Sequence, residues 1–209
     1  MRTVIWDLGG TLLDTYPVVD RALARAVTGG EDPDTDLLAE VARLTRVSSG
    51  HAVSELSARH QVPEEELRDA YAATRETWRH DPPAPMAGAE QVLAAVHAAG
   101  GLNLVATHRD RESATELLAA AGLDVDDLVS ASDGFPRKPD PSMVRELLRR
   151  HGLDPQDVFV VGDRPADVEA ARAAGVRGVL LTTPGVQHAG PGIDRVTALE
   201  QLVGRIDAS

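Results

Sequence analysis

The spacing of apolar residues changes character along the chain. Residues 2–6 form a short, mostly apolar run, RTVIW, which is typical of a buried strand. Between residues 17 and 80, apolar residues recur at intervals of three and four, which predicts helices. The expected helices in this block cover 18–27, 36–44, 53–60 and 64–78. Pro63, followed by three glutamates, is a typical helix start.

After a proline-rich segment at 80–85, strands and helices are expected to alternate. The expected strands cover 102–106, 128–130, 158–161 and 178–181. The expected helices cover 88–99, 111–121, 141–151, 165–174 and 197–206. Such alternation predicts an α/β protein with a Rossmann-like parallel sheet. The core domain would comprise residues 1–15 and 84–209, with a helical domain inserted at 16–83.

Composition and charge narrow the classes of function. Of the 209 residues, 43% are hydrophobic, which is enough for a packed core and excludes wholesale disorder. A net charge of −12 argues against nucleic acid or an anionic membrane as partner. It allows a small phosphorylated substrate, because a bound metal can supply positive charge. The absence of cysteine excludes disulfides and thiol chemistry.

The sequence lacks targeting and membrane signals. It has neither a signal-peptide pattern at its start nor an apolar run of about 18 residues, so a cytoplasmic location is expected. The oligomeric state cannot be predicted.

Lys138 is the only lysine among 21 basic residues. Genomic base composition explains the excess of arginine but not the one lysine that remains, and we therefore expect Lys138 to have a functional role.

Polar residues follow the expected strands at the edge where ligands bind in open α/β sheets. Asp7 and Thr107 come directly after two strands, and Asp163 follows a third. Lys138 precedes the helix at 141–151, and Asp167 lies four residues after Asp163, in the first turn of a helix. These side chains are expected to converge on one site.

The converging groups suit phosphate chemistry. A carboxylate can attack phosphorus and form an aspartyl-phosphate. Several carboxylates around one point repel one another unless a hard cation such as Mg²⁺ joins them. A hydroxyl, an ammonium and the N–H groups of a turn can hold the phosphoryl oxygens. Each residue also has a purely structural interpretation: Asp7 and Asp163 as turn or cap residues, Thr107 as a strand-end cap, and Asp167 as a solvated acid. All of these residues occur in the expected order after the expected strands and helices, which favours one functional site over the separate structural interpretations.

Four motifs resemble those of the haloacid dehalogenase (HAD) superfamily. DLGGTLLD at 7–14 is similar to its first motif, DxDGTLxD, and Thr107 at a strand end is similar to its second. RKPDP at 137–141 resembles the third motif, and GDRPADVEA at 162–170 resembles the fourth, GDSxxDxxxA. The resemblance covers nearly the whole chain. The helical insertion lies where subfamily I members carry a C1 cap domain.

The resemblance implies roles for the matching positions. Asp7 would be the nucleophile, with Thr107 and Lys138 as the other catalytic residues. The implied metal ligands for Mg²⁺ are Asp7, the backbone carbonyl of Gly9, Asp163 and Asp167. The implied phosphate-binding residues are Gly10, Thr11, Thr107, His108 and Lys138.

One position departs from the pattern. Family phosphatases carry a second Asp two residues after the nucleophile, as the general acid and base, and here that position is Gly9. Dehalogenases and phosphonoacetaldehyde hydrolases in the family also lack this Asp. The expected cap contains no lysine for a Schiff base, and the intact acidic fourth motif favours phosphate and Mg²⁺.

The sequence therefore predicts a Mg²⁺-dependent phosphatase that acts on a small phosphorylated metabolite through an aspartyl-phosphate, with His108 as a possible substitute acid. The alternative is a catalytically impaired protein that binds phosphate and metal. A phosphorylated receiver domain is disfavoured by the insertion after the first strand. Arg46, Ser48, Ser49 and His51 could contact the leaving group, or could form a polar turn between helices.

Overall fold

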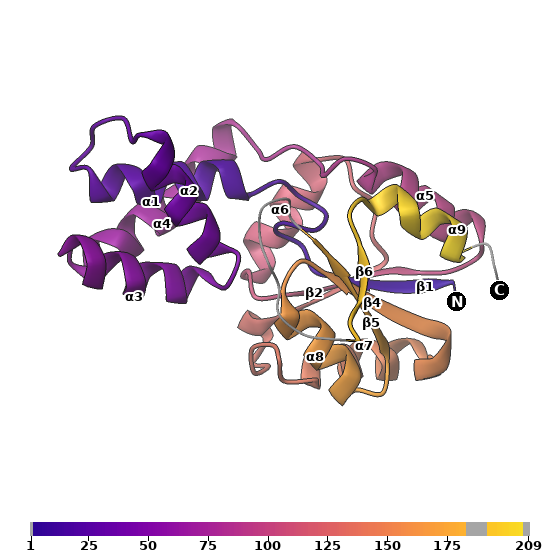
Figure 1. Ribbon diagram of the computed structural model, residues 1–209. Coiled ribbons are helices and arrows are strands. Elements are labelled where there is room, and N and C mark those ends of the chain that lie inside the picture. Colours follow the sequence, from indigo (N-terminus) through magenta and orange to yellow (C-terminus); the bar gives the residue numbers. More distant parts are fainter. Residues whose placement is uncertain (1, 183–191, 207–209) are drawn as a thin grey trace. The chain divides into compact units, whose positions relative to one another are not determined.

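The chain divides into two compact units. The computed structural model describes residues 2–182 and 192–206 (Figure 1). Met1–Asp14 and Ala84–Ser209 make up one unit, and Thr15–Pro83 make up the other. Each unit has its own secondary structure and its own buried residues.

The larger unit is built on a six-stranded parallel sheet. Its strands are β1 (Thr3–Trp6), β2 (Asn103–Thr107), β3 (Asp127–Ser130), β4 (Val158–Gly162), β5 (Arg177–Leu181) and β6 (Asp194–Val196). They follow the order β3-β2-β1-β4-β5-β6, and every neighbouring pair is parallel. The predicted α/β class is confirmed. Because β1 lies in the middle of the sheet, the residue after it falls at the centre of the edge where ligands bind.

Helices cover both faces of this sheet. They are α5 (Ala89–Ala98), α6 (Arg111–Ala120), α7 (Ser142–His151), α8 (Pro165–Ala173) and α9 (Val203–Ile206). Figure 1 shows α5 and α9 on one face and α7 and α8 on the other. Coverage of both faces explains why all the residues of β1, β2 and β4 are buried.

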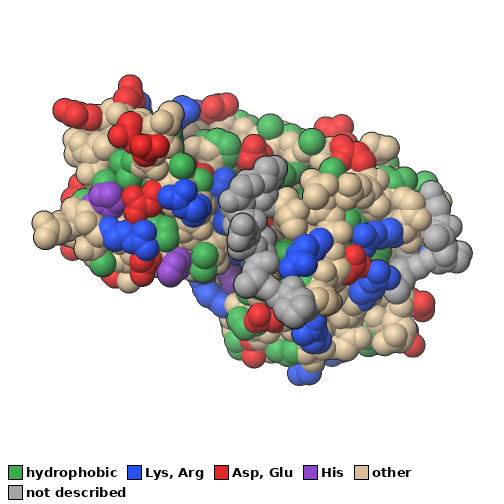
Figure 2. All heavy atoms as spheres, viewed as in Figure 1, with side chains coloured by type: hydrophobic (Ala, Val, Ile, Leu, Met, Phe, Trp, Pro, Cys, Tyr) green, Lys and Arg blue, Asp and Glu red, His purple; other side chains and the backbone are tan. Residues whose placement is uncertain are grey.

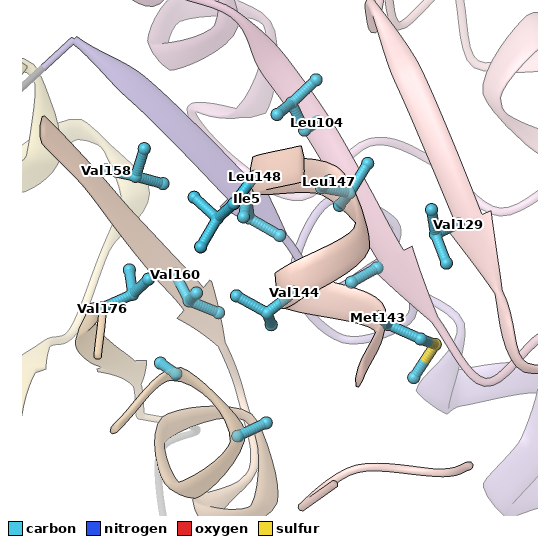
Figure 3. Close-up of a cluster of buried hydrophobic side chains, with 13 residues drawn as sticks. Ile5, Leu104, Val129, Met143, Val144, Leu147, Leu148, Val158, Val160 and Val176 are labelled. Carbon is cyan, nitrogen blue, oxygen red and sulfur yellow. The ribbon is translucent and has the colours of Figure 1, made fainter. Parts of the chain in front are cut away.

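The core beneath α7 holds the strands in place. Met143, Val144 and Leu147 are fully buried on one side of this helix and pack against Ile5 and Leu104 of the sheet (Figure 3). Burying a side chain of this size contributes roughly 1.5–3 kcal/mol. This packing fixes the start of α7, and with it the segment just before the helix, which carries Lys138.

The smaller unit is entirely helical where the structure describes it. Its helices are α1 (Tyr16–Val27), α2 (Thr35–Thr45), α3 (Ser49–His60) and α4 (Glu64–His80). The prediction of a helical insertion after the first strand is confirmed.

The turn between α2 and α3 has a clear structural basis. Ser48 caps α3 by accepting a hydrogen bond from the N–H of His51 at 3.0 Å. The Arg46 guanidinium pairs with Asp20 and lies 3.8 Å from the centroid of the Tyr16 ring. These contacts support the interpretation of this segment as a polar connection between helices, with Ser49 and His51 in the first turn of α3. A role in contacting substrate stays a prediction.

The C-terminal segment differs from the expectation. The predicted helix at 197–206 was wrong over its first part, where Ala198 is extended, a 3₁₀ turn covers Leu199–Leu202, and α9 follows. The N–H of Thr197 bonds to the side chain of Gln201, which accounts for the later start. Strand β6 was not predicted, because it is only three residues long and only its last residue is buried.

Charged residues of both signs are interspersed on the surface shown in Figure 2. Near the sheet edge, for example, Arg177 and Arg205 both bond to Asp194. Within the described residues, no helix combines the length and the apolar character needed to cross a membrane.

Candidate active site

Three strand ends place the predicted site residues together. Asp7 follows β1, and its backbone N–H donates to the carbonyl of Val161 in β4 at 2.8 Å. Thr107 is the last residue of β2 and is 3% exposed. Asp163 follows β4 and is fully buried. The parallel pairing of these strands with β1 in the centre therefore brings the three side chains to one edge.

Lys138 reaches this edge from the loop before α7. Its Nζ lies 2.5 Å from Oδ1 of Asp7 and also contacts Oδ1 of Asp167. It donates a third hydrogen bond to the carbonyl of Ala106 at 3.0 Å. An ammonium has three N–H donors, so all three are used. The residue is 8% exposed, and a charge at that depth requires such partners.

The pKa values of these groups reflect the shared charge. Burial acts to raise the pKa of Asp7, but Lys138, and then Arg164 and His108, outweigh it and lower the pKa below its usual range. Burial, together with the negative charge of Asp7, raises the pKa of Asp167 despite Lys138. Asp7 is therefore ionised at neutral pH, as a nucleophile must be.

The carboxylates offer a plausible ligand set for a hard cation. Asp7, Asp163 and Asp167 each present an oxygen, and these three oxygens lie within 4.8 Å of one another. Oxygen ligands from carboxylates are those that Mg²⁺ prefers. The Thr11 hydroxyl donates to Oδ1 of Asp163 at 3.4 Å, and the N–H of Arg164 donates to Oδ2 of Asp167 at 3.1 Å. The donor set thus fits the metal that the sequence suggests.

Gly162 permits the close approach of Asp167. A Cβ at residue 162 would lie 2.2 Å from Cγ of Asp167, which is far inside van der Waals contact. The glycine at the start of the fourth motif is therefore required by packing at this position. Its role is to let α8 bring Asp167 against the end of β4.

The turn after Asp7 is closed by its own hydrogen bonds. The N–H of Gly10 donates to the carbonyl of Leu13 at 2.8 Å, and the N–H of Thr11 bonds to the carbonyl of Leu8 at 3.4 Å. Gly10 has φ of 84°, which favours glycine there. In this structure, Gly10 and Thr11, two of the five residues that were expected to bind phosphate, thus close the turn, and the Thr11 side chain supports Asp163.

His108 accepts a hydrogen bond in this site and does not lie there as a proton donor. Its Nε2 accepts a hydrogen bond from the backbone N–H of Lys138 at 2.7 Å. Burial, and then the charge of Lys138, lower the pKa of His108 from 6.5 to about 4. The ring is therefore neutral at neutral pH, with one nitrogen already engaged. Both features count against the idea that His108 substitutes for the missing acid.

Comparison with known proteins decides the family. The model of the haloacid dehalogenase-like hydrolases matches residues 1–175. The chain belongs to this hydrolase family. It is 32% identical over 192 residues to a phosphoglycolate phosphatase of Rhodospirillum rubrum, covering 87% of this chain and 79% of the relative.

Solved structures agree with this assignment. A hydrolase from Streptococcus pneumoniae TIGR4 is 28% identical, with a TM-score of 0.64, over 88% of this chain and 94% of that one. A HAD family hydrolase from Deinococcus radiodurans R1, solved with bound phosphate and sodium, has a TM-score of 0.76 at 23% identity. The match covers 97% of this chain and 93% of that one, and shows a shared fold.

Three features of this HAD-like hydrolase were missed by reasoning from the sequence. The carbonyl of Ala106 carries no sequence signal, because every residue has one. The bond from Lys138 to His108 joins residues 30 positions apart. Arg164 lies close enough to Asp7 to lower its pKa, and its place directly after Asp163 in the fourth motif was the available signal.

Proposed function

We propose that this hydrolase is a Mg²⁺-dependent phosphatase that acts on a small phosphorylated metabolite, with Asp7 as the nucleophile. The observation that carries the proposal is the Lys138 ammonium, held between Asp7 and Asp167 at the edge of a carboxylate cluster that also contains Asp163. An ionised nucleophile, a buried cation and a metal ligand set in one place are what phosphoryl transfer requires.

The residues suggest a two-step reaction. An oxygen of Asp7 attacks phosphorus, the bond to the leaving oxygen breaks, and an aspartyl-phosphate forms. Water then attacks phosphorus, releases inorganic phosphate and regenerates the Asp7 carboxylate. Lys138 and the Thr107 hydroxyl would hold phosphoryl oxygens as charge develops on them. Mg²⁺ held by Asp7, Asp163, Asp167 and the Gly9 carbonyl would neutralise phosphoryl charge.

The missing carboxyl at Gly9 shapes the expected rates. With no acid at that position, the leaving oxygen must depart as an anion or take its proton from water. Loss of general acid catalysis typically costs about 10²–10⁴ in rate. Acyl and aryl phosphates, whose leaving groups are stable anions, should therefore react best.

Relatives suggest which substrate to test first. The Rhodospirillum rubrum protein is named a phosphoglycolate phosphatase, so phosphoglycolate is the first candidate. We also propose that residues 16–83 form a C1 cap of subfamily I, whose contacts select the leaving group. Arg46, Ser48, Ser49 and His51 remain candidates for that selection.

Turnover assays test the proposal. Phosphoglycolate, acetyl phosphate and p-nitrophenyl phosphate are each assayed with Mg²⁺, using Asp7→Asn as the control, which keeps shape but removes the nucleophile. The wild type should hydrolyse at least one substrate, and Asp7→Asn should lose about 10³-fold or more of that activity. Equal activity in Asp7→Asn would overturn the proposal.

A second candidate function follows from Gly9. Because position 9 carries no carboxyl and His108 is engaged with Lys138, the protein could bind phosphate and metal without turnover. In that case, no substrate would be hydrolysed, but beryllium fluoride or vanadate would still bind in the presence of Mg²⁺. Binding that disappears in Asp7→Asn would assign it to this site.

A further inference from the structure

The loop that carries Lys138 is attached to the end of β2 at two points. The side chain of Lys138 donates to the carbonyl of Ala106 at 3.0 Å. The backbone N–H of the same lysine donates to Nε2 of His108 at 2.7 Å. Ala106 lies in β2, and His108 is the first residue after this strand. The end of β2 therefore binds both the ammonium group and the backbone N–H of Lys138.

The state of the His108 ring suits this contact. A ring nitrogen accepts a hydrogen bond only when it carries no proton, so Nε2 must be bare and Nδ1 must carry the hydrogen. Burial and the nearby charge of Lys138 lower the pKa of His108 to about 4. At neutral pH the ring is a permanent acceptor for the Lys138 amide.

We propose that His108 is a positioning residue that anchors the backbone of Lys138, so that its ammonium lies between Asp7 and Asp167. Lysine has a long, flexible stem, and its head can be placed accurately only when its backbone is fixed. The packing of α7 fixes where the loop ends, but without the anchor the backbone of Lys138 loses its hydrogen bond to the end of β2 and can shift relative to the strand. A misplacement of about 1 Å at a reacting centre can cost up to about 10²-fold in rate.

Two variants of His108 distinguish a role in positioning Lys138 from a role as a general acid. The Gln oxygen lies as far along the side chain as Nε2 of His, whereas the Asn oxygen lies only as far as Nδ1. Gln at 108 can therefore accept the bond from Lys138, whereas Asn is too short. Neither amide can donate a proton as a general acid. An anchoring role predicts that His108→Gln is tolerated and His108→Asn is not.

The single lysine provides a direct probe that needs no enzymatic activity. Protein that lacks a tag and carries ¹⁵N at the α-nitrogen of lysine should give one backbone amide signal, from Lys138. Its hydrogen exchange is measured in the wild type and in His108→Gln, His108→Asn and His108→Ala. Loss of a buried hydrogen bond should speed exchange about tenfold or more in the Asn and Ala variants. His108→Gln should stay within about threefold of wild type. Unchanged exchange in folded His108→Ala or His108→Asn would overturn the anchor.

Activity then tests whether the anchor matters for catalysis, and this part rests on the proposed function. With p-nitrophenyl phosphate, His108→Ala and His108→Asn should lose about 10–100-fold in kcat/KM, and His108→Gln should retain most of it. If Lys138 is protected in His108→Gln but turnover falls as far as in His108→Ala, His108 acts chemically and the positioning role is wrong. If exchange follows the expected order but the wild type itself is inactive, the anchor stands and the phosphatase proposal fails.

Discussion

Replacing Gly9 with Asp would restore the carboxyl that other family phosphatases carry two residues after the nucleophile. The backbone allows it: Gly10 is among the described glycines with positive φ and Gly9 is not, and Gly9 is partly exposed. The new side chain should supply the missing proton to the leaving oxygen. General acid catalysis contributes about 10²–10⁴ in rate. We expect a gain of about 10–10³-fold, because a newly placed acid will not be optimally aligned.

The substitution also has an electrostatic cost. Each carboxylate of the cluster that lies about 5 Å from the new one adds roughly 3 kcal/mol of repulsion at an effective dielectric constant of about 20. Lys138 offsets one such interaction, and solvent at the partly exposed position 9 screens the rest, so we expect a loss of about 1–3 kcal/mol in the free energy of unfolding without metal. Mg²⁺ should restore more stability to Gly9→Asp than to the wild type, because the added charge favours the cation.

The assay compares turnover of phosphoglycolate, whose leaving group is poor, with that of p-nitrophenyl phosphate. Gly9→Asp should improve phosphoglycolate more, because protonation matters most for poor leaving groups. Gly10→Asp is the matched control: Gly10 is buried with φ of 84°, so Asp there should destabilise the protein and give no gain. If Gly9→Asp folds, binds Mg²⁺ and accelerates no substrate, the missing acid does not limit this protein.

Other substitutions test the remaining contacts. Lys138→Arg keeps the charge but not the shape, so vanadate affinity should fall about 10–100-fold; unchanged affinity would mean that shape is irrelevant. Gly162→Ala places a Cβ against Asp167. It should lower the free energy of unfolding in urea by about 1–3 kcal/mol and reduce the stabilisation by Mg²⁺, which calorimetry would check. Because the pKa of His108 falls from 6.5 to about 4 on folding, the unfolded chain binds more protons between these values, and stability decreases as pH falls through this window. The full pKa shift would correspond to a loss of roughly 3 kcal/mol in the free energy of unfolding, and solvent at the partly exposed ring should reduce this loss to about 1–2 kcal/mol. His108→Gln should lack this contribution when urea unfolding at pH 7 is compared with unfolding at pH 4.5.

Much of the core could be predicted because its signals are local. The runs that became β1, β2 and β4 are apolar and bounded by turn residues, and the helices between them have regular spacing. Strand β6 could not be predicted in this way, because its sequence, Asp-Arg-Val, has no apolar run and is defined by pairing with β5. The same limit applies to the segment before α9, where the hydrogen bond that the Thr197 N–H donates to the Gln201 side chain delays the helix.

The site was predictable as a set of positions but not as a set of contacts. Parallel strands end at one edge, so Asp7, Thr107 and Asp163 were expected to lie near one another. The partners of each side chain depend on distances of a few tenths of an ångström. Those distances are set by packing between segments that are far apart in the chain. His108 illustrates the difference, because its neighbours, and not its residue type, make it an acceptor for Lys138.

The three contacts of Lys138 explain why arginine does not suit this position. Its ammonium directs three N–H donors at three separate acceptors: a carboxylate oxygen on Asp7, another on Asp167, and the carbonyl of Ala106. A guanidinium carries five donors in one plane and is larger, so it cannot reach acceptors arranged around a point. A phosphoryl oxygen that binds this ammonium must replace one of the three. Since the Ala106 carbonyl is fixed within a strand, the exchange must occur at a carboxylate. Exchange at Asp7 would release the nucleophile from its hydrogen bond as the phosphoryl group arrives.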